Sequence, residues 1–175
     1  MNESRHDDAR FGSVKVVVPA PKSGGVATAQ RACGTCTACC DGWVAGTIRG
    51  FAMKPGTPCH FRGEGCCTIY AERPESPCRK FVCGWLMPAS PLPEAFRPDR
   101  LGVIFVPTTW QGAPAFILVN AGRDPDDGLI AWMHDYARAH RVPFFYERGG
   151  ERFGFGPAEF QREMADRVAK GERLW

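Results

Sequence analysis

The chain has 175 residues, of which 44% are apolar and 23% charged, and its formal net charge is +3. These values predict one globular domain of ordinary size with room for a small appendage. The weak positive charge gives no strong signal for nucleic-acid binding. No apolar run approaches the roughly 20 residues that a membrane-spanning helix needs, so we expect no membrane partner.

Residues 1–30 form a polar leader. The leader carries acidic residues and lacks an apolar stretch of signal-peptide length. PKSGG at Pro21–Gly25 is typical of a linker or turn. We therefore expect a cytoplasmic protein, in a compartment where thiols stay reduced.

A cysteine-rich segment follows at residues 31–90. All nine cysteines lie between Cys33 and Cys83. In a reducing compartment such a dense set predicts metal ligands or catalytic thiols before disulfides, and an odd number cannot pair completely within one chain. This segment is therefore where we expect the chemistry of the protein.

The segment begins with CGTCTACC, in which the spacing of the thiols is informative. Cys33 and Cys36, and again Cys36 and Cys39, are separated by two residues, so that one tight turn can direct both sulfurs inward. Gly34 can supply the unusual backbone angles of such a turn. Cys39 and Cys40 are adjacent, and adjacent side chains diverge. We expect that they do not both close one single-ion site, so that one of them reaches a second ion, bridges two ions or stays unligated.

More thiols follow in PC at Pro58–Cys59, in CTIYAERPESPCRKF at Cys67–Phe81 and in CGWL at Cys83–Leu86. Together with CGTCTACC, this pattern resembles the CxxCxxCC family, whose bacterial, mostly uncharacterised members are described as zinc- or iron-chelating cysteine-cluster proteins. The resemblance covers roughly residues 33–86. Related cysteine clusters occur in flagellin lysine methylases, but we find no Gly-rich cofactor loop after a strand that would support a methyltransferase.

The resemblance implies that eight cysteines hold zinc or iron, an iron–sulfur centre included: Cys33, Cys36, Cys39, Cys40, Cys59, Cys67, Cys78 and Cys83. Eight thiolates suit two four-coordinate sites, or one polynuclear cluster with fewer protein ligands. Cys66 is additional to the motif, and we expect a small buried apolar side chain there. His60 is a further candidate ligand, since imidazole suits zinc and iron. A lone histidine more often makes an ordinary hydrogen bond.

The neighbours of these cysteines suit a negatively charged centre. A divalent zinc ion with four thiolates has a formal charge of minus two, so two such sites concentrate minus four in one region. Four cations are close in sequence and can offset it: Arg62, Arg73, Arg79 and Lys80. Arg73 and Arg79 lie inside the motif and are the stronger candidates for bonds to the sulfurs. We expect an apolar cover from Tyr70, Phe81 and Trp85.

Residues 91–175 contain no cysteine and predict an α+β unit packed on the cysteine-rich segment. LGVIFVPT (101–108) and PAFILVN (114–120) are apolar and partly β-branched, which predicts a hairpin. A helix follows, with Asp124 as its N-cap and Pro125 at its first position, and Pro143 stops it.

The remaining sequence repeats this order of elements. PFFYE and RFGF, on either side of residues 148–151, predict a second hairpin. A last helix begins at Pro157, places Phe160, Met164 and Val168 on one face, and ends near Gly171. The order ββαββα predicts an antiparallel sheet with two helices against it.

Three functions remain open from the sequence. The first is a metal-binding protein whose cysteine cluster is structural or carries metal. The second is an iron-dependent redox or protein-modification enzyme or subunit, which needs open coordination positions. The third is a redox sensor in which vicinal thiols cycle. The sequence identifies no catalytic residue and no protein partner, so the partner it predicts is the metal ion itself.

Overall fold

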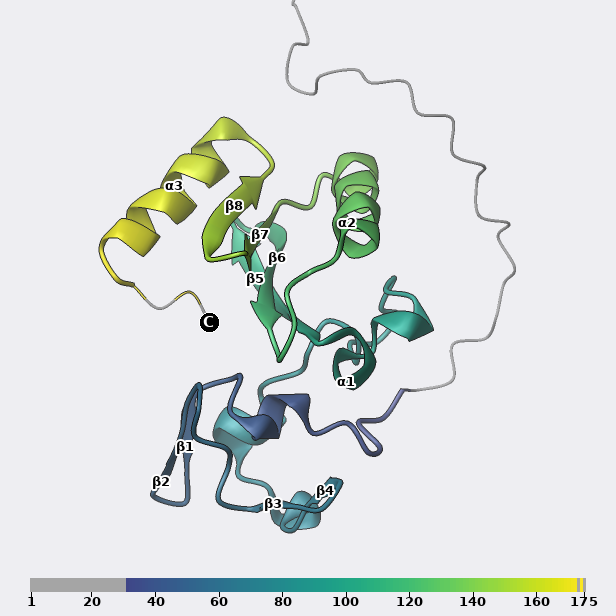
Figure 1. The fold of residues 1–175 in the computed structure, drawn as a ribbon, viewed down its shortest axis with the longest axis vertical. Helices are drawn as coiled ribbons and strands as arrows, with labels where there is room; N and C mark the ends of the chain where they lie inside the picture. Colours follow the sequence, from purple (N-terminus) through teal and green to yellow (C-terminus); the bar gives the residue numbers. More distant parts are fainter. Residues whose placement is uncertain (1–30, 173, 175) are drawn as a thin grey trace, which may run out of the picture.

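The structure is a computed structural model that describes residues 31–172 and 174. The predicted leader, residues 1–30, lies outside the described residues. Short elements make up the cysteine-rich segment, and a four-stranded sheet with helices makes up the rest (Figure 1). The predicted α+β class is confirmed. In the described part of the chain, no helix has the length and apolar character to cross a membrane.

The cysteine-rich segment is built from turns and two small antiparallel ribbons. Strand β1 pairs with β2, and β3 pairs with β4. The elements in chain order are η1 (Ala38–Asp41), β1 (Gly46–Ile48), β2 (Phe51–Met53), β3 (Arg62–Gly63), β4 (Cys66–Cys67), η2 (Tyr70–Glu72) and η3 (Glu75–Arg79). Strand β1 packs closely on η3, since a Cβ atom added to Gly46 would lie 2.8 Å from Cγ of Pro77.

The sheet has the strand order β5-β6-β7-β8. After η4 (Glu94–Phe96) and α1 (Pro98–Leu101), the predicted first hairpin is present as β5 (Val103–Trp110) and β6 (Ala113–Asn120). Its two-residue turn, Gln111–Gly112, has positive φ at both positions (49° and 78°), which suits the right-handed twist of the strands.

One pair in the sheet is parallel. Strand β6 pairs in parallel with β7 (Phe144–Arg148), whereas β7 and β8 (Glu151–Phe155) form the predicted second hairpin. The sheet is therefore mixed, where the sequence predicted antiparallel pairing throughout. The reason is topological: α2 (Asp127–His140) connects β6 to β7 and returns the chain to run in the same direction.

Helix α2 begins two residues later than the sequence predicted. Its N-cap is Asp126, whose Oδ1 accepts a hydrogen bond of 2.7 Å from the backbone N–H of Leu129. The prediction of Asp124 as the cap is wrong because that carboxylate has other partners. It accepts hydrogen bonds from the Asn120 side chain and from the backbone N–H of Gly149. Asp124 thus joins the end of β6 to the turn between β7 and β8.

The sheet is covered by both long helices, which flank it in Figure 1. Helix α3 (Ala158–Ala169) follows Pro157 as predicted and buries Phe160 and Met164. Helix α2 buries a stripe of apolar side chains, Leu129, Ile130, Met133 and Ala137. Both helices therefore contribute to one large core centred on the sheet.

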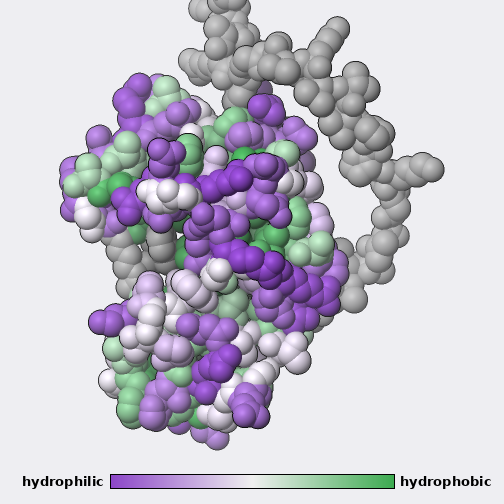
Figure 2. All heavy atoms as spheres, viewed as in Figure 1, coloured by the Kyte–Doolittle hydropathy of each residue, from purple (hydrophilic) through white to green (hydrophobic). Residues whose placement is uncertain are grey.

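The described residues form two hydrophobic clusters that divide the cysteine-rich segment. The large core of the sheet extends into it through Ala38, Val44, Cys83 and Trp85. A second, small cluster is formed by Ile48, Met53 and Cys59. A hollow of about 410 Å³ lies between the sheet and the cysteine-rich segment and is bordered by Trp43, Leu118 and Phe145 (Figure 2).

Candidate metal centre

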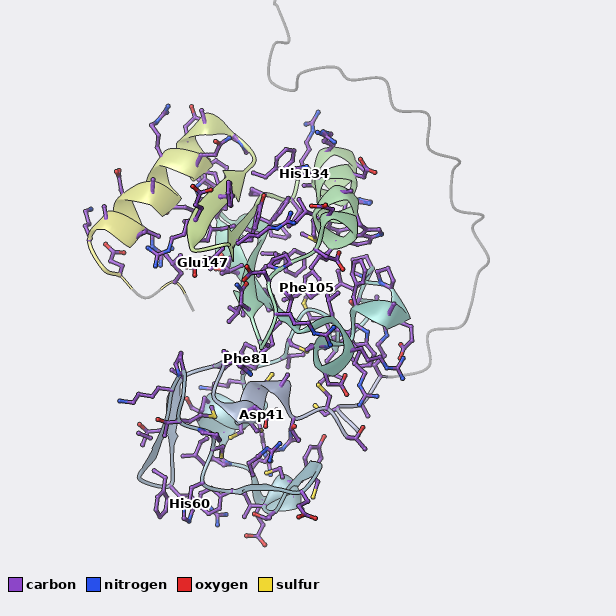
Figure 3. All side chains as sticks on the ribbon, in the orientation of Figure 1. Asp41, His60, Phe81, Phe105, His134 and Glu147 are labelled. Atoms are coloured by element: carbon purple, nitrogen blue, oxygen red, sulfur yellow. The ribbon has the colours of Figure 1, made fainter. Side chains whose placement is uncertain are left out.

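All nine cysteines line one cavity of about 250 Å³ in the cysteine-rich segment. Sulfur atoms gather in this half of the molecule, around the labelled Asp41 and Phe81 (Figure 3). The remaining wall is mainly apolar and includes Val44, Ile48 and Met53. The fold therefore brings thiols that are up to 50 positions apart, from Cys33 to Cys83, to one place.

Tight turns direct several of these cysteines toward the cavity. The backbone N–H of Cys36 donates to the carbonyl of Cys33 at 2.9 Å, which closes the turn that the sequence predicted. Gly34 within it has a φ of 54°, a conformation that costs glycine little. The backbone N–H of Leu86 likewise donates to the carbonyl of Cys83 at 2.9 Å.

One group of thiols, which we name the first thiol set, consists of Cys33, Cys36, Cys39 and Cys83. The last three lie in or against the large core, and Cys33 acts electrostatically on Cys39 and Cys83. Cys83 is buried, while Cys36 and Cys39 are partly buried and pack against the same core. Burial raises the pKa of Cys39 well above its ordinary value, and the thiols of Cys83, Cys40, Cys36 and Cys33 raise it further. Burial and the thiols of Cys33 and Cys36 also raise the pKa of Cys83. These side chains are thus close enough to repel one another when ionised.

A second group, which we name the second thiol set, consists of Cys40, Cys59, Cys67 and Cys78. Cys40, Cys59 and Cys78 lie in or against the small cluster, and Cys67 acts electrostatically on Cys40 and Cys78. Cys59 is only 7% exposed, and Cys40 and Cys78 pack around it. Burial, followed by the thiols of Cys59, Cys67 and Cys78, raises the pKa of Cys40 to about 12. The pKa of Cys78 is raised by burial and then by Cys59 and Cys67.

The boundary between the two sets falls between consecutive residues. Cys39 and Cys40 both belong to η1, yet Cys39 packs against the large core and Cys40 against the small cluster. The two thiols influence each other, since Cys40 is among the causes that raise the pKa of Cys39. The backbone carbonyl of Cys40 accepts from the N–H of Cys59 at 2.8 Å, which ties η1 to the second set.

The thiols are neighbours without forming a closed coordination shell. Among the histidine, cysteine and acidic side chains of residues 31–172 and 174, no three converge closely enough to hold a metal ion. The ligand type suits a thiolate-bound metal, since each set offers four cysteine sulfurs among the residues that line the cavity. Coordination would require these sulfurs to move inward.

Cys66 and His60, which the sequence analysis also considered, belong to neither thiol set. The prediction that Cys66 is buried is wrong: it belongs to β4 and is exposed, because the short ribbon leaves this strand at the surface. His60 is exposed at the outer end of the cysteine-rich segment (Figure 3), where its ring stacks on Phe51 at 3.8 Å. Its ring is thus engaged with an aromatic neighbour and does not line the cavity.

The predicted cations divide into those that border the cavity and those that do not. Arg73 and Arg79 line it, whereas Arg62 forms an ion pair with Asp41. Lys80 is exposed. The guanidinium of Arg79 donates to the backbone carbonyl of Ala71 at 3.0 Å.

Sequence reasoning missed Arg97, which lies far from the motif in the chain. Its guanidinium donates to the Thr35 hydroxyl at 2.8 Å, and its positive charge is among the influences that lower the pKa of Cys33. Burial outweighs these influences and raises that pKa overall. No local signal marks Arg97, because its approach to Cys33 depends on the packing of residues 91–100 against the first turn.

The predicted apolar cover is present in part. Phe81 lines the cavity, whereas Trp85 is only 4% exposed and belongs to the large core behind it. Tyr70 lines the cavity but is 49% exposed. The cavity is therefore shielded from water mainly on the side that faces the large core, whereas the side formed by Tyr70 is accessible to solvent.

Comparisons with known proteins leave the family open. No protein-family model, curated protein or solved structure matches the chain.

Proposed function

We propose that this chain is a metal-binding protein that holds two zinc or iron centres, one in each thiol set, in a structural or metal-carrying role. The observation that carries the proposal is the division of six cysteines between two apolar clusters, with the boundary between Cys39 and Cys40. The two other cysteines, Cys33 and Cys67, act electrostatically on thiols of the first and the second set respectively. Two four-thiolate groups are the ligand sets that structural zinc and iron–sulfur centres use.

The proposal agrees with the resemblance to the CxxCxxCC family, and it further assigns the eight cysteines of the motif to two separate sets of four. When bound, zinc supplies a redox-inert cross-link between chain segments, and iron supplies one-electron chemistry. The residues of this chain would supply the thiolates, an apolar wall and the nearby positive charge of Arg73 and Arg97. Because ligands from distant segments are joined, binding free energy becomes folding free energy.

Metal analysis of protein purified without oxygen tests the proposal. We expect about two equivalents of metal per chain in a zinc form. A colourless protein identifies zinc, whereas a brown protein with acid-labile sulfide identifies iron–sulfur centres. Wild-type protein that holds no metal after anaerobic purification and reconstitution contradicts the proposal.

Three matched cysteine variants sharpen this test. Cys36→Ser and Cys78→Ser each remove one thiol from a different set, so we expect each to lose about one of two metal equivalents. Cys66→Ser is the control, because this thiol is exposed and outside both sets. Equal metal content in all three variants and wild type would show that the ligand assignment is wrong.

A further inference from the structure

The first thiol set combines two stretches of chain that lie far apart in the sequence. Cys33 and Cys36 belong to one turn, whereas Cys83 follows 50 positions after Cys33. Cys83 is held by the sheet, since the backbone N–H of the next residue, Gly84, donates to the carbonyl of Phe105 at 2.7 Å. Closing a chain loop of this length costs conformational entropy, unless the fold has already brought its ends together. The contacts that hold the turn beside Cys83 therefore bear on any ligand that the set binds.

Arg31 joins these two stretches through its side chain. It lies two residues before Cys33, and its guanidinium donates to the backbone carbonyls of Trp85 at 2.9 Å and of Leu92 at 2.8 Å. The guanidinium carbon lies 4.7 Å from the centroid of the Trp85 ring, and Nε lies 3.6 Å from the carboxylate of Glu94. The start of the turn is thus tied to the chain that follows the last cysteine.

Trp85 is a firm support for this connection. Its side chain is only 4% exposed and belongs to the large core, and it follows Cys83 by two residues. The Arg31 side chain is itself only 24% exposed, so its hydrogen bonds are partly shielded from water. Hydrogen bonds from a charged donor are stronger than neutral ones, and the planar guanidinium can donate to two carbonyls at once. Arg31 therefore holds the turn against a part of the chain that the core keeps in place.

Arg97 makes the same connection in the opposite direction along the chain. Its guanidinium donates to the hydroxyl of Thr35, inside the turn, at 2.8 Å, and its Nε lies 2.9 Å from the carboxylate of Asp99. Its guanidinium carbon lies 6.0 Å from the centroid of the Trp85 ring. The two arginines thus approach the same indole ring, and Arg31 holds the start of the turn while Arg97 holds its middle.

We propose that Arg31 is a positioning residue of the first thiol set, which holds Cys33 and Cys36 beside Cys83 before any metal binds. The part of this inference that concerns metal affinity rests on the proposed function. Arg31 lies outside the cysteine motif and acts without contact to the metal. By fixing the turn, it reduces the ordering that metal binding must otherwise impose on the chain. Loss of its bonds should therefore weaken the metal of the first set alone.

Chelator release in two backgrounds tests the effect on metal binding. Cys78→Ser leaves the first set intact and Cys36→Ser the second, so each background should hold one Zn²⁺ ion. Each is loaded with Zn²⁺ under anaerobic conditions and titrated with a chromophoric chelator. We expect Arg31→Ala to weaken Zn²⁺ binding about tenfold or more in the Cys78→Ser background, since two charge-assisted hydrogen bonds are lost. In the Cys36→Ser background we expect no change from the parent.

Two further substitutions separate position from charge. Arg31→Lys keeps the charge but cannot donate to both carbonyls as a planar fork, so we expect at least about threefold weaker binding in the first set. Thr35→Val changes no charge and removes the bond from Arg97, and it should weaken the same ion. Arg123→Ala is the matched control, because Arg123 donates to the backbone carbonyl of Arg100 at 2.9 Å and joins segments outside the turn. It should release Zn²⁺ as its parent does.

Cross-linking of metal-free protein tests the position of the turn directly. Reduced protein is treated with a short bifunctional thiol reagent, and the linked cysteines are identified by mass spectrometry. We expect Arg31→Ala to lose most of the links between Cys36 and Cys83. Links between Cys40 and Cys59 should keep their wild-type yield, because the backbone N–H of Cys59 donates to the carbonyl of Cys40 whether or not Arg31 is present.

Several results would overturn the inference. One is a Zn²⁺ affinity of Arg31→Ala equal to that of its parent in the Cys78→Ser background, and another is a wild-type yield of Cys36–Cys83 links. Equal weakening in both backgrounds also overturns it, since Arg31 would then serve overall stability, as does parental affinity in Arg31→Lys, since charge alone would then suffice. If Arg31→Ala does not fold, Arg31→Lys and Thr35→Val decide by the same comparisons. Failure of wild type to hold two Zn²⁺ ions contradicts the proposed function instead, and cross-linking still tests Arg31.

Discussion

Replacing either of two consecutive cysteines should remove a different metal centre. In η1, Cys39 packs against the large core and Cys40 against the small cluster. We therefore expect Cys39→Ser to lose the metal of the first set and Cys40→Ser that of the second. Each variant should keep about one of two metal equivalents, because the other four thiols are intact.

The cost in stability follows from the loss of a whole metal centre. Structural zinc contributes about 10–16 kcal/mol in small zinc-finger peptides, which is comparable to the roughly 5–15 kcal/mol that stabilises a whole domain. Since each kcal/mol corresponds to roughly 2–4 °C for a chain of this size, we expect the loss of one ion to lower Tm by about 20 °C or more. Thermal unfolding followed by circular dichroism, on the same samples used for metal analysis, measures both quantities.

Double variants test which thiols belong together. Cys39→Ser combined with Cys83→Ser affects one set twice, so we expect about one metal equivalent to remain, as in either single variant. Cys39→Ser combined with Cys78→Ser affects both sets, and we expect nearly all metal to be lost. If the first pair loses both metals, or the second pair keeps one, the partition at Cys39 and Cys40 is refuted.

Two other perturbations test how the sheet supports the site and the fold. Gly84→Ala places a Cβ atom 2.9 Å from Cβ of Phe105, and overpacking of this kind costs about 1–3 kcal/mol. We expect a lower Tm and weaker metal binding in the first set alone, which chelator release measures; loss from the second set first would contradict this. His134 has a pKa lowered by burial and then by Arg138, although Asp135 opposes the shift. The folded form therefore disfavours its protonation, so stability is lost as the pH falls below the unfolded pKa of about 6.5. His134→Gln should lose less stability than wild type between pH 7.5 and 5.5 in paired urea titrations, and parallel curves would show that His134 does not contribute.

The sequence was sufficient for elements whose signals are local. Both hairpins and both long helices follow from apolar patterning and from turn residues such as Gly112 and Pro157. The pairing of β6 with β7 was not predictable in this way, because it depends on where α2 returns the chain. The choice between Asp124 and Asp126 as helix cap was likewise decided by a distant partner, the backbone N–H of Gly149.

The candidate site was predicted as a group of residues but not as an arrangement. The motif supplies all eight thiols, and their spacing gives the turn between Cys33 and Cys36. For six of these thiols, membership of a set depends on whether the side chain packs at the sheet core or at the small cluster, and the spacing of the motif does not determine this packing. The exposure of Cys66 and the approach of Arg97 to Cys33 have the same origin, since both depend on contacts beyond their local sequence.

The two thiol sets differ in how firmly the surrounding structure holds them, and this difference determines how much order each metal would add. Cys83 is followed by Gly84, whose backbone N–H donates to the carbonyl of Phe105 at 2.7 Å, so the first set is joined directly to β5. In the second set, Cys59 is buried with Ile48 and Met53, and Cys40 and Cys78 pack against this small cluster, which lies in the part of the chain that forms the two-stranded ribbons. Isolated two-stranded ribbons are marginally stable in water. A metal in the second set would therefore supply much of the order of its surroundings, whereas a metal in the first set would be added to a region that the sheet core already holds in place.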